Sequence, residues 1–160
     1  MTEWRRGSLA AVVVFMIAVT SASCIAWENV GPIEISRSDD QLAVAFCTEQ
    51  RIETLRVLQL APGATARSDW QLAWEGVGPV DVQAGDVIYL GAEPGLFSSV
   101  VQLEDFRFLE QHSYEIDVDT ERGGYQVTFR VPSGGLDDDT WIAPTGRIGQ
   151  TACEAFNIGP

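Results

Sequence analysis

Strict alternation of apolar and polar side chains is the feature that most limits what this chain folds into. Between residues 112 and 131, two segments place an apolar side chain at every second position, at Tyr114, Ile116, Val118, Tyr125, Val127, Phe129 and Val131. Successive side chains of a strand point to opposite faces, whereas a helix repeats every 3.6 residues. The pattern therefore predicts two strands, each with one buried and one exposed face.

These two segments are close enough in sequence to pair as an antiparallel hairpin. A two-residue turn at Arg122-Gly123 sets Val118 opposite Val127 on the inner face. The same register sets Glu115 opposite Arg130 on the outer face. Apolar pairs on one face and a charge pair on the other are what a stable register requires, so we predict this pairing.

The rest of the chain continues in the same style, with short alternating runs separated by Gly, Pro, Asp and Ser. Further strands are predicted at residues 32–36, 41–47, 52–60, 69–75, 80–83, 87–90 and 141–143. Residues 80–83 and 87–90 are expected to form a hairpin, and residues 98–109 fit either a strand or a short helix. Many short strands at this spacing predict an all-β fold, an antiparallel β-sandwich of immunoglobulin-like or related type.

An apolar N-terminal segment precedes this β domain. Arg5-Arg6 are followed by the apolar run Leu9–Thr20 and by the small residues Ser21-Ala22-Ser23. A positive start, an apolar stretch and a small-residue site are typical of a secretory signal peptide. We therefore divide the chain into a signal peptide or membrane anchor at 1–23 that forms an apolar helix, a tether at 24–31, and an extracytoplasmic β domain at 32–160.

The residue after the small-residue site is Cys24, and this arrangement resembles a bacterial lipobox, in which the cysteine is lipidated. Ser21 departs from that pattern, which usually has an aliphatic residue three positions before the cysteine. Two alternatives stay open: ordinary cleavage, and a retained membrane helix flanked by Trp4 and Trp27. Each places the domain beyond the membrane, at its outer face or secreted, with the N-terminal anchor or lipid as its contact with the bilayer.

Cysteine content and charge narrow the possible partners. Cys47 and Cys153 remain as a pair once Cys24 is set aside, and outside the membrane such a pair usually forms a disulfide. The formal net charge is −13, and all ten basic residues are arginine. A nucleic-acid partner is excluded by this charge, because binding phosphates requires a basic surface.

The Cys24 leader, the Cys47 and Cys153 pair, and the strand entry Gly85-Asp86-Val87-Ile88-Tyr89-Leu90 together resemble small membrane-anchored or lipoprotein-type envelope proteins of high-GC Gram-positive bacteria. The resemblance covers the general layout of the chain. It implies a cell-envelope location and implies no enzymatic activity.

Catalytic motifs are scarce in this sequence. A chain without lysine has no phosphate-binding loop of the Gly-Lys-Ser/Thr type and no lysine nucleophile. The single histidine, His112, pairs with a cysteine only if both thiols escape the disulfide. Glu115, Asp117 and Asp119 share one face of a predicted strand, and each is about 7 Å from the next along it. This spacing suits a carboxylate-based hydrolase, although a solvated strand face is the simpler interpretation.

Two further groups are candidate binding sites. Asp137, Asp138 and Asp139 form an acidic run that is a weak candidate for calcium, without the spacing of an EF-hand. Trp70 and Trp74 alternate around Leu72, and together with Trp141 they are candidates for a ligand platform or for the core. We expect no cofactor and a non-enzymatic role in binding an envelope protein or a glycan, with a carbohydrate-binding module as the first alternative and a small hydrolase as the second.

Overall fold

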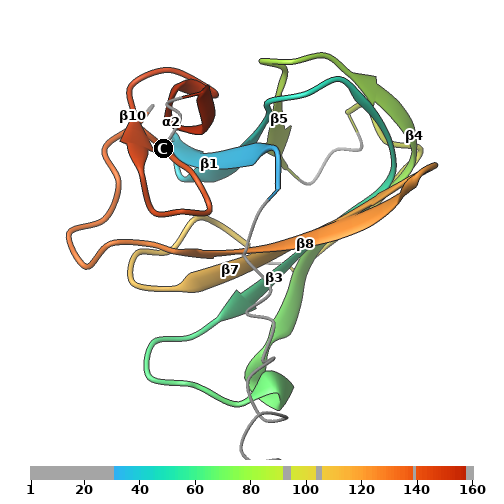
Figure 1. Cartoon of the computed structure of the whole chain (residues 1–160). Coiled ribbons are helices and arrows are strands. Elements are labelled where there is room, and N and C mark those ends of the chain that lie inside the picture. The colour runs from blue at the N-terminus through green and yellow to red at the C-terminus, as the bar shows by residue number, and fades with distance from the viewer. Residues whose placement is uncertain (1–30, 92–94, 104–105, 139, 158–160) are drawn as a thin grey trace, which may run out of the picture.

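Two five-stranded antiparallel sheets face one another in this protein (Figure 1). The computed structural model describes residues 31–91, 95–103, 106–138 and 140–157. The all-β sandwich expected from the sequence is confirmed. The apolar N-terminal helix, Cys24 and all but the last residue of the tether lie outside the described residues. Within the described ranges there is no helix with the length and hydropathy needed to cross a bilayer.

Each sheet mixes strands from distant parts of the chain. Sheet A has the order β10 (Ile148–Gly149), β9 (Trp141–Ile142), β1 (Ile33–Ser38), β2 (Gln41–Phe46) and β5 (Val87–Leu90). Sheet B has the order β6 (Ser99–Gln102), β4 (Gln71–Val82), β3 (Gln50–Leu60), β7 (Ser113–Thr120) and β8 (Gly123–Arg130). Two short helical turns complete the fold, η1 (Arg67–Asp69) and α2 (Glu154–Asn157).

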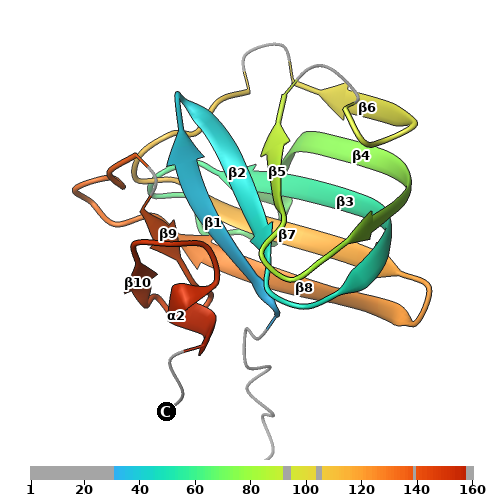
Figure 2. The same ribbon diagram turned by 90° about the horizontal axis from the view of Figure 1, so that it is seen from above.

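The strand order overlaps with that of immunoglobulin variable domains. Strands β8-β7-β3-β4 and β1-β2-β5 lie in the order that strands G-F-C-C′ and A-B-E take there. Tyr114, at the start of β7, bonds through its hydroxyl to the backbone N–H of Leu109 at 2.7 Å, as a tyrosine corner does. Burial raises the pKa of Tyr114 to about 12. The remaining strands differ from that arrangement, because β6 follows β5 in the chain and because β9 and β10 extend sheet A. The strands of the two sheets cross at a steep angle (Figure 2).

The main core fills the space between the sheets. Leu42, Val44 and Phe46 of β2 are fully buried there, which confirms the face predicted by their alternation. Sheet B supplies Val57, Ile116 and other side chains of the same cluster from its inner face. Burial of this apolar area is the main force that holds the two sheets together.

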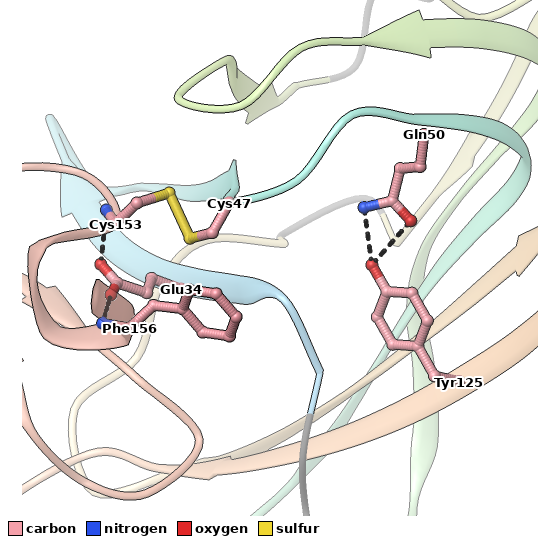
Figure 3. Close-up of a disulfide and its surroundings, with 6 residues drawn as sticks. All are labelled: Glu34, Cys47, Gln50, Tyr125, Cys153 and Phe156. Carbon is pink, nitrogen blue, oxygen red and sulfur yellow. Dashed lines mark hydrogen bonds between the residues drawn. A yellow bond between two sulfur atoms is a disulfide. The ribbon is translucent and has the colours of Figure 1, made fainter. Parts of the chain in front are cut away.

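A second, smaller core covers the outer face of sheet A. Ala43 and Ala45 of β2 pack there with Trp141 and with the disulfide between Cys47 and Cys153 (Figure 3). The predicted disulfide is confirmed, and it joins residues 106 positions apart in the sequence. Strands β1 and β2 are therefore buried on both faces, one against sheet B and the other against the C-terminal segment.

A buried carboxylate fixes the same C-terminal segment. Glu34 of β1 is fully buried, and its two oxygens accept backbone N–H groups of Cys153 at 2.8 Å and Phe156 at 2.6 Å (Figure 3). Burial raises the pKa of Glu34, and the N–H groups that point at the carboxylate act in the opposite direction. The side chain thus satisfies backbone donors at the start of α2 that would otherwise be buried without partners.

The register predicted for the hairpin of β7 and β8 is wrong by two residues. Val118 lies opposite Tyr125, and Glu115 lies opposite Thr128, because the turn is formed one residue earlier than predicted, at Glu121-Arg122. A shift of two residues leaves every side chain on its predicted face, so alternation alone does not detect it.

Two other local predictions are also wrong, and the first part of the ambiguous segment, Ser99–Gln102, is a strand. Residues 80–83 and 87–90 do not form a hairpin, because β4 belongs to sheet B and β5 pairs with β2 in sheet A. Leu72 and Trp74 do not share a face, because the pairing of β3 with β4 shifts between Val57 and Leu58 and leaves Ala73 as an extra residue. Strand β6 occupies part of the ambiguous segment.

Removing the disulfide tests how strongly the C-terminal segment is held. For the double variant Cys47→Ala/Cys153→Ala, the chain-entropy model predicts a loss of up to about 4–5 kcal/mol in unfolding free energy. Urea unfolding of the oxidised wild type and the variant measures this loss. An unchanged far-UV spectrum confirms that the sandwich survives, and an unchanged unfolding free energy would contradict the role assigned to the bond.

Replacing Glu34 tests the buried carboxylate. Glu34→Gln puts an amide donor beside backbone donors, so we expect a loss of about 1–3 kcal/mol in unfolding free energy. Because the folded pKa is raised, protonation of Glu34 favours the folded state. This contribution is complete below the ordinary value of 4.5 and is lost as the pH rises through the folded pKa. The stability gap between wild type and variant, measured by urea unfolding, should therefore widen as the pH falls toward the ordinary value of 4.5.

Glu154→Gln is the matched control, with the opposite sign. Backbone N–H groups of Gln150 and Thr151 lower the pKa of Glu154, so its contribution is present above the ordinary value of 4.5 and is lost as the pH falls through the lowered pKa. Its gap to wild type should stay constant above about pH 5 and shrink only at lower pH. Equal pH profiles for the two variants would refute the assignment of Glu34.

Candidate functional site

An open groove of about 350 Å³ crosses the edge of the sandwich at β8, and we call it the Trp70 groove. Its volume lies at the lower end of the range of about 300–1,000 Å³ that small-molecule sites occupy. The ends of β3, β7 and β8 form its floor. The connection between β3 and β4, which carries Trp70, forms its first wall, and the turn between β9 and β10 forms its second wall. The lining residues are Leu60, Trp70, Ser113, Thr128, Arg130, Ile142, Ala143, Pro144, Thr145 and Gly146.

The connection between β3 and β4 positions Trp70. This connection, residues 61–70, is largely exposed and contains η1 and the turn at Pro62-Gly63. Arg67 of η1 bonds Glu115 on the outer face of β7, at 2.5 Å between Nη1 and Oε2. This ion pair holds the connection against sheet B and leaves Trp70 half-buried beside the groove.

The three tryptophans predicted as a ligand platform do not come together. Trp74 is only 2% exposed and belongs to the main core, where its indole N–H donates to the Gly91 carbonyl at 2.9 Å. Trp141 is 7% exposed and belongs to the small core under the C-terminal segment. Of these three, Trp70 lines the Trp70 groove, and Trp74 and Trp141 do not.

Of the three carboxylates on β7, only Glu115 departs from the solvated strand face suggested by the sequence, whereas Asp119 is exposed and Asp117 is half-buried. Glu115 is buried beneath Arg67, and its Oε1 has no hydrogen-bond partner among the described residues. Asp117 accepts a hydrogen bond from Gln126 at 2.7 Å. Asp119 pairs with Arg56, which also binds Glu75. Each of these carboxylates is therefore bound to a different neighbouring residue, and none of them lines the Trp70 groove.

A second groove, of about 650 Å³, lies at the end of the sandwich near the turn between β7 and β8, and we call it the Arg51 groove. Arg51 forms ion pairs there with Glu53, Asp81 and Glu121. Asp81 and Glu121 are both exposed and share this one arginine. A general acid requires a carboxyl group in an apolar, water-poor setting, so this groove does not have the features of a hydrolase site.

The calcium candidates are only partly described. Asp138 is exposed and pairs with Arg37 at 3.2 Å, so an arginine already occupies the position that a cation would take. Asp137 is exposed, and Asp139 lies outside the described residues. The described part of the chain contains no cluster of three or more His, Cys, Asp or Glu side chains able to hold a metal.

His112 does not form the cysteine–histidine pair considered from the sequence. His112 Nδ1 lies 3.0 Å from the Glu110 carbonyl, and Cys47 and Cys153 are both used in the disulfide. No free thiol therefore remains among the described residues to act with His112 as a nucleophile.

Sequence reasoning missed the two arginines that define the site. Arg67 lies in a loop without periodicity, and nothing local connects it to Glu115. Arg130 was paired with Glu115 in the predicted register, and it lies opposite Ser113 in the structure. The available signal was the absence of any acidic residue next to Arg130 in a chain with 23 acidic side chains.

No protein-family model and no curated protein sequence matches this chain. Two solved structures are similar to part of it. One is catalytically inactive OgpA from Akkermansia muciniphila in complex with an O-glycopeptide substrate, at 16% identity and a TM-score of 0.40. That match covers 68% of this chain and 29% of OgpA, so the chain spans less than a third of that protein.

The second structure is the solution structure of R. palustris CsgH, at 12% identity and a TM-score of 0.30. It covers 61% of this chain and 87% of CsgH. Both TM-scores are below 0.5, and neither similarity supports an argument about function.

Proposed function

We propose that this chain is an extracytoplasmic β-sandwich, tethered to the membrane by its N-terminal segment, that binds a cell-envelope glycan in the Trp70 groove and catalyses no reaction. The observation that carries the proposal is the groove itself, in which a half-buried indole lies beside hydroxyl groups. The role is that of a binding module that presents one site from a rigid scaffold.

The lining of the Trp70 groove favours a glycan over an envelope protein. The apolar face of a sugar ring packs against an aromatic side chain, and Trp70 provides such a face. Ser113 and Thr145 add hydroxyl groups, which both donate and accept hydrogen bonds. A few polar groups around an apolar surface, in a small concave site, suit a sugar better than a broad protein interface, which buries about 800 Å² per partner.

The disulfide supports a location outside the cytoplasm. Such bonds form and persist in oxidising compartments and are rare where thioredoxin and glutathione keep thiols reduced. The bond between Cys47 and Cys153 encloses most of the domain, and its formation fits an oxidising environment.

The entry point of the chain relates the tether to the groove. Gly31 lies against Tyr125 and Val127 of β8, so closely that a Cβ atom on residue 31 would be 2.4 Å from a methyl group of Val127. The N-terminal segment thus joins the domain at the same strand that carries Arg130 and Thr128 of the groove. Tethering raises the effective concentration of the site near the membrane.

Intact mass of the protein extracted from membranes tests the tether. We expect the protein in the membrane fraction, with a mass that begins at Cys24, adds a diacylglycerol group and lacks two hydrogens for the disulfide. A full-length chain with reduced thiols in the soluble fraction would contradict the proposed location.

Truncating the indole tests the binding site. Trp70→Ala should raise the dissociation constant for soluble peptidoglycan glycan strands about tenfold or more, because a buried aromatic contact is lost. Leu72→Ala is the matched control, since Leu72 is 41% exposed on the same sheet and lies outside the groove. Titration calorimetry on the full-length protein, in a polyoxyethylene detergent whose headgroup carries no sugar, measures both variants. Equal affinity of wild type and Trp70→Ala would refute the proposed site.

A further inference from the structure

We propose that the Trp70 groove selects sugars that carry a carboxylate group and that the Arg130 guanidinium binds this carboxylate. The inference rests on the proposed function, because it names the class of glycan that the same groove takes. It follows from the charge of the groove, which differs in sign from the charge of the protein as a whole.

Arg130 is the only charged residue among those that line the groove. The chain has 23 acidic residues and a net charge of −13, and yet none of the lining residues is acidic. At a positive site on an acidic protein, the electrostatic energy of an anion is lower than elsewhere on the surface. This energy difference is largest when the arginine has no carboxylate partner of its own.

Arg130 has no such partner within the described parts of the chain. Ion pairs hold Arg37, Arg51, Arg56 and Arg67, each with between one and three carboxylates, whereas Arg130 forms none there. Its side chain is exposed, so its guanidinium donors are accessible to a ligand.

The register of the hairpin explains why Arg130 is left unpaired. Ser113 is its direct neighbour on β7, and Glu115, the next outward residue on that strand, lies opposite Thr128. Glu115 is in turn bound and covered by Arg67. The loop that positions Trp70 therefore also carries the arginine that occupies Glu115, the nearest carboxylate to Arg130 on this face of β7.

The shape of the lining favours a carboxylated sugar over a simple anion. An arginine binds a carboxylate through two parallel N–H groups, which fixes the plane of the ligand. Trp70 then offers an apolar face for the sugar ring, and the hydroxyl groups of Ser113 and Thr145 face the remaining ring substituents. A single arginine without a second cation suits a carboxylate of charge −1 better than a phosphate of charge close to −2.

Matched pairs of sugars test the inference on the full-length protein in the same polyoxyethylene detergent. The probes are methyl β-D-glucuronide against methyl β-D-glucoside, and N-acetylmuramic acid against N-acetylglucosamine. Binding is followed by the NMR shift of the Trp70 indole N–H, assigned with Trp70→Phe. We expect each acidic sugar to bind about tenfold more tightly than its neutral partner, with a preference that decreases as salt is added.

Arg130→Gln should abolish the preference, so that the acidic and the neutral member of each pair bind with the same affinity. An unchanged far-UV circular dichroism spectrum shows that the variant is folded. Arg122→Gln is the control, because Arg122 is an exposed arginine in the turn at the opposite end of the same hairpin and should leave the preference intact.

The possible outcomes separate the inference from the proposed function. Equal binding of acidic and neutral sugars, or a preference that survives Arg130→Gln, overturns the inference and leaves the proposed function standing. Failure of all four sugars and of the glycan strands to bind overturns both. Sodium acetate or glucose 6-phosphate binding as tightly as the glucuronide overturns the inference, because the groove would then be a general anion site.

Discussion

The attachment of the C-terminal segment to the outer face of sheet A is the constraint on which the site depends. Two contacts hold this segment: the disulfide between Cys47 and Cys153, and the hydrogen bonds from the segment to the buried carboxylate of Glu34. The turn between β9 and β10, which forms the second wall of the Trp70 groove, belongs to the same part of the chain. Besides that attachment, β9 is held by its short pairing with β1 and by the burial of Trp141 and Ile142.

A similar dependence governs the first wall of the groove. The connection between β3 and β4 buries almost no apolar surface, so packing alone does not fix its position. The ion pair between Arg67 and Glu115 supplies the contact, and its loss would leave the buried Glu115 carboxylate without a charge partner. The first wall is thus held to the sandwich by an ion pair, and the second by a disulfide and a buried carboxylate. Loops fixed on a rigid scaffold are common in binding sites.

The sequence predicted the strands and their buried faces better than it predicted which strands pair with one another. Alternation correctly placed Leu42, Val44 and Phe46 in the core, because burial of one face imposes a period of two on the strand. It did not reveal that β4 and β5 lie in different sheets, since both outcomes show the same local pattern. The extra residue at Ala73 placed Trp74 in the core and Leu72 outside it, and a bulge has no signature in alternation.

The candidate site was harder to predict than the fold, for the same physical reason. The sequence singled out Trp70, and it did not connect this residue with Arg130, which lies 60 positions away. Their proximity depends on the register of one hairpin and on the path of one loop, and neither is encoded in a local pattern. By contrast, the disulfide was predictable, because two cysteines in a domain that the sequence predicts to be exported usually pair.

The size of the groove sets what a binding protein of this kind is able to do. A site for one or two sugar rings buries little area and binds weakly, because the cost of immobilising a ligand consumes much of the interaction energy. Tethering changes this balance, since a site confined near the membrane meets a polymeric glycan at a high effective concentration. Selectivity then matters more than affinity. Among the described residues, Arg130 has no ion-pair partner and no acidic side chain lines the groove. The proposed site would therefore attract an anionic sugar that the acidic surface elsewhere repels.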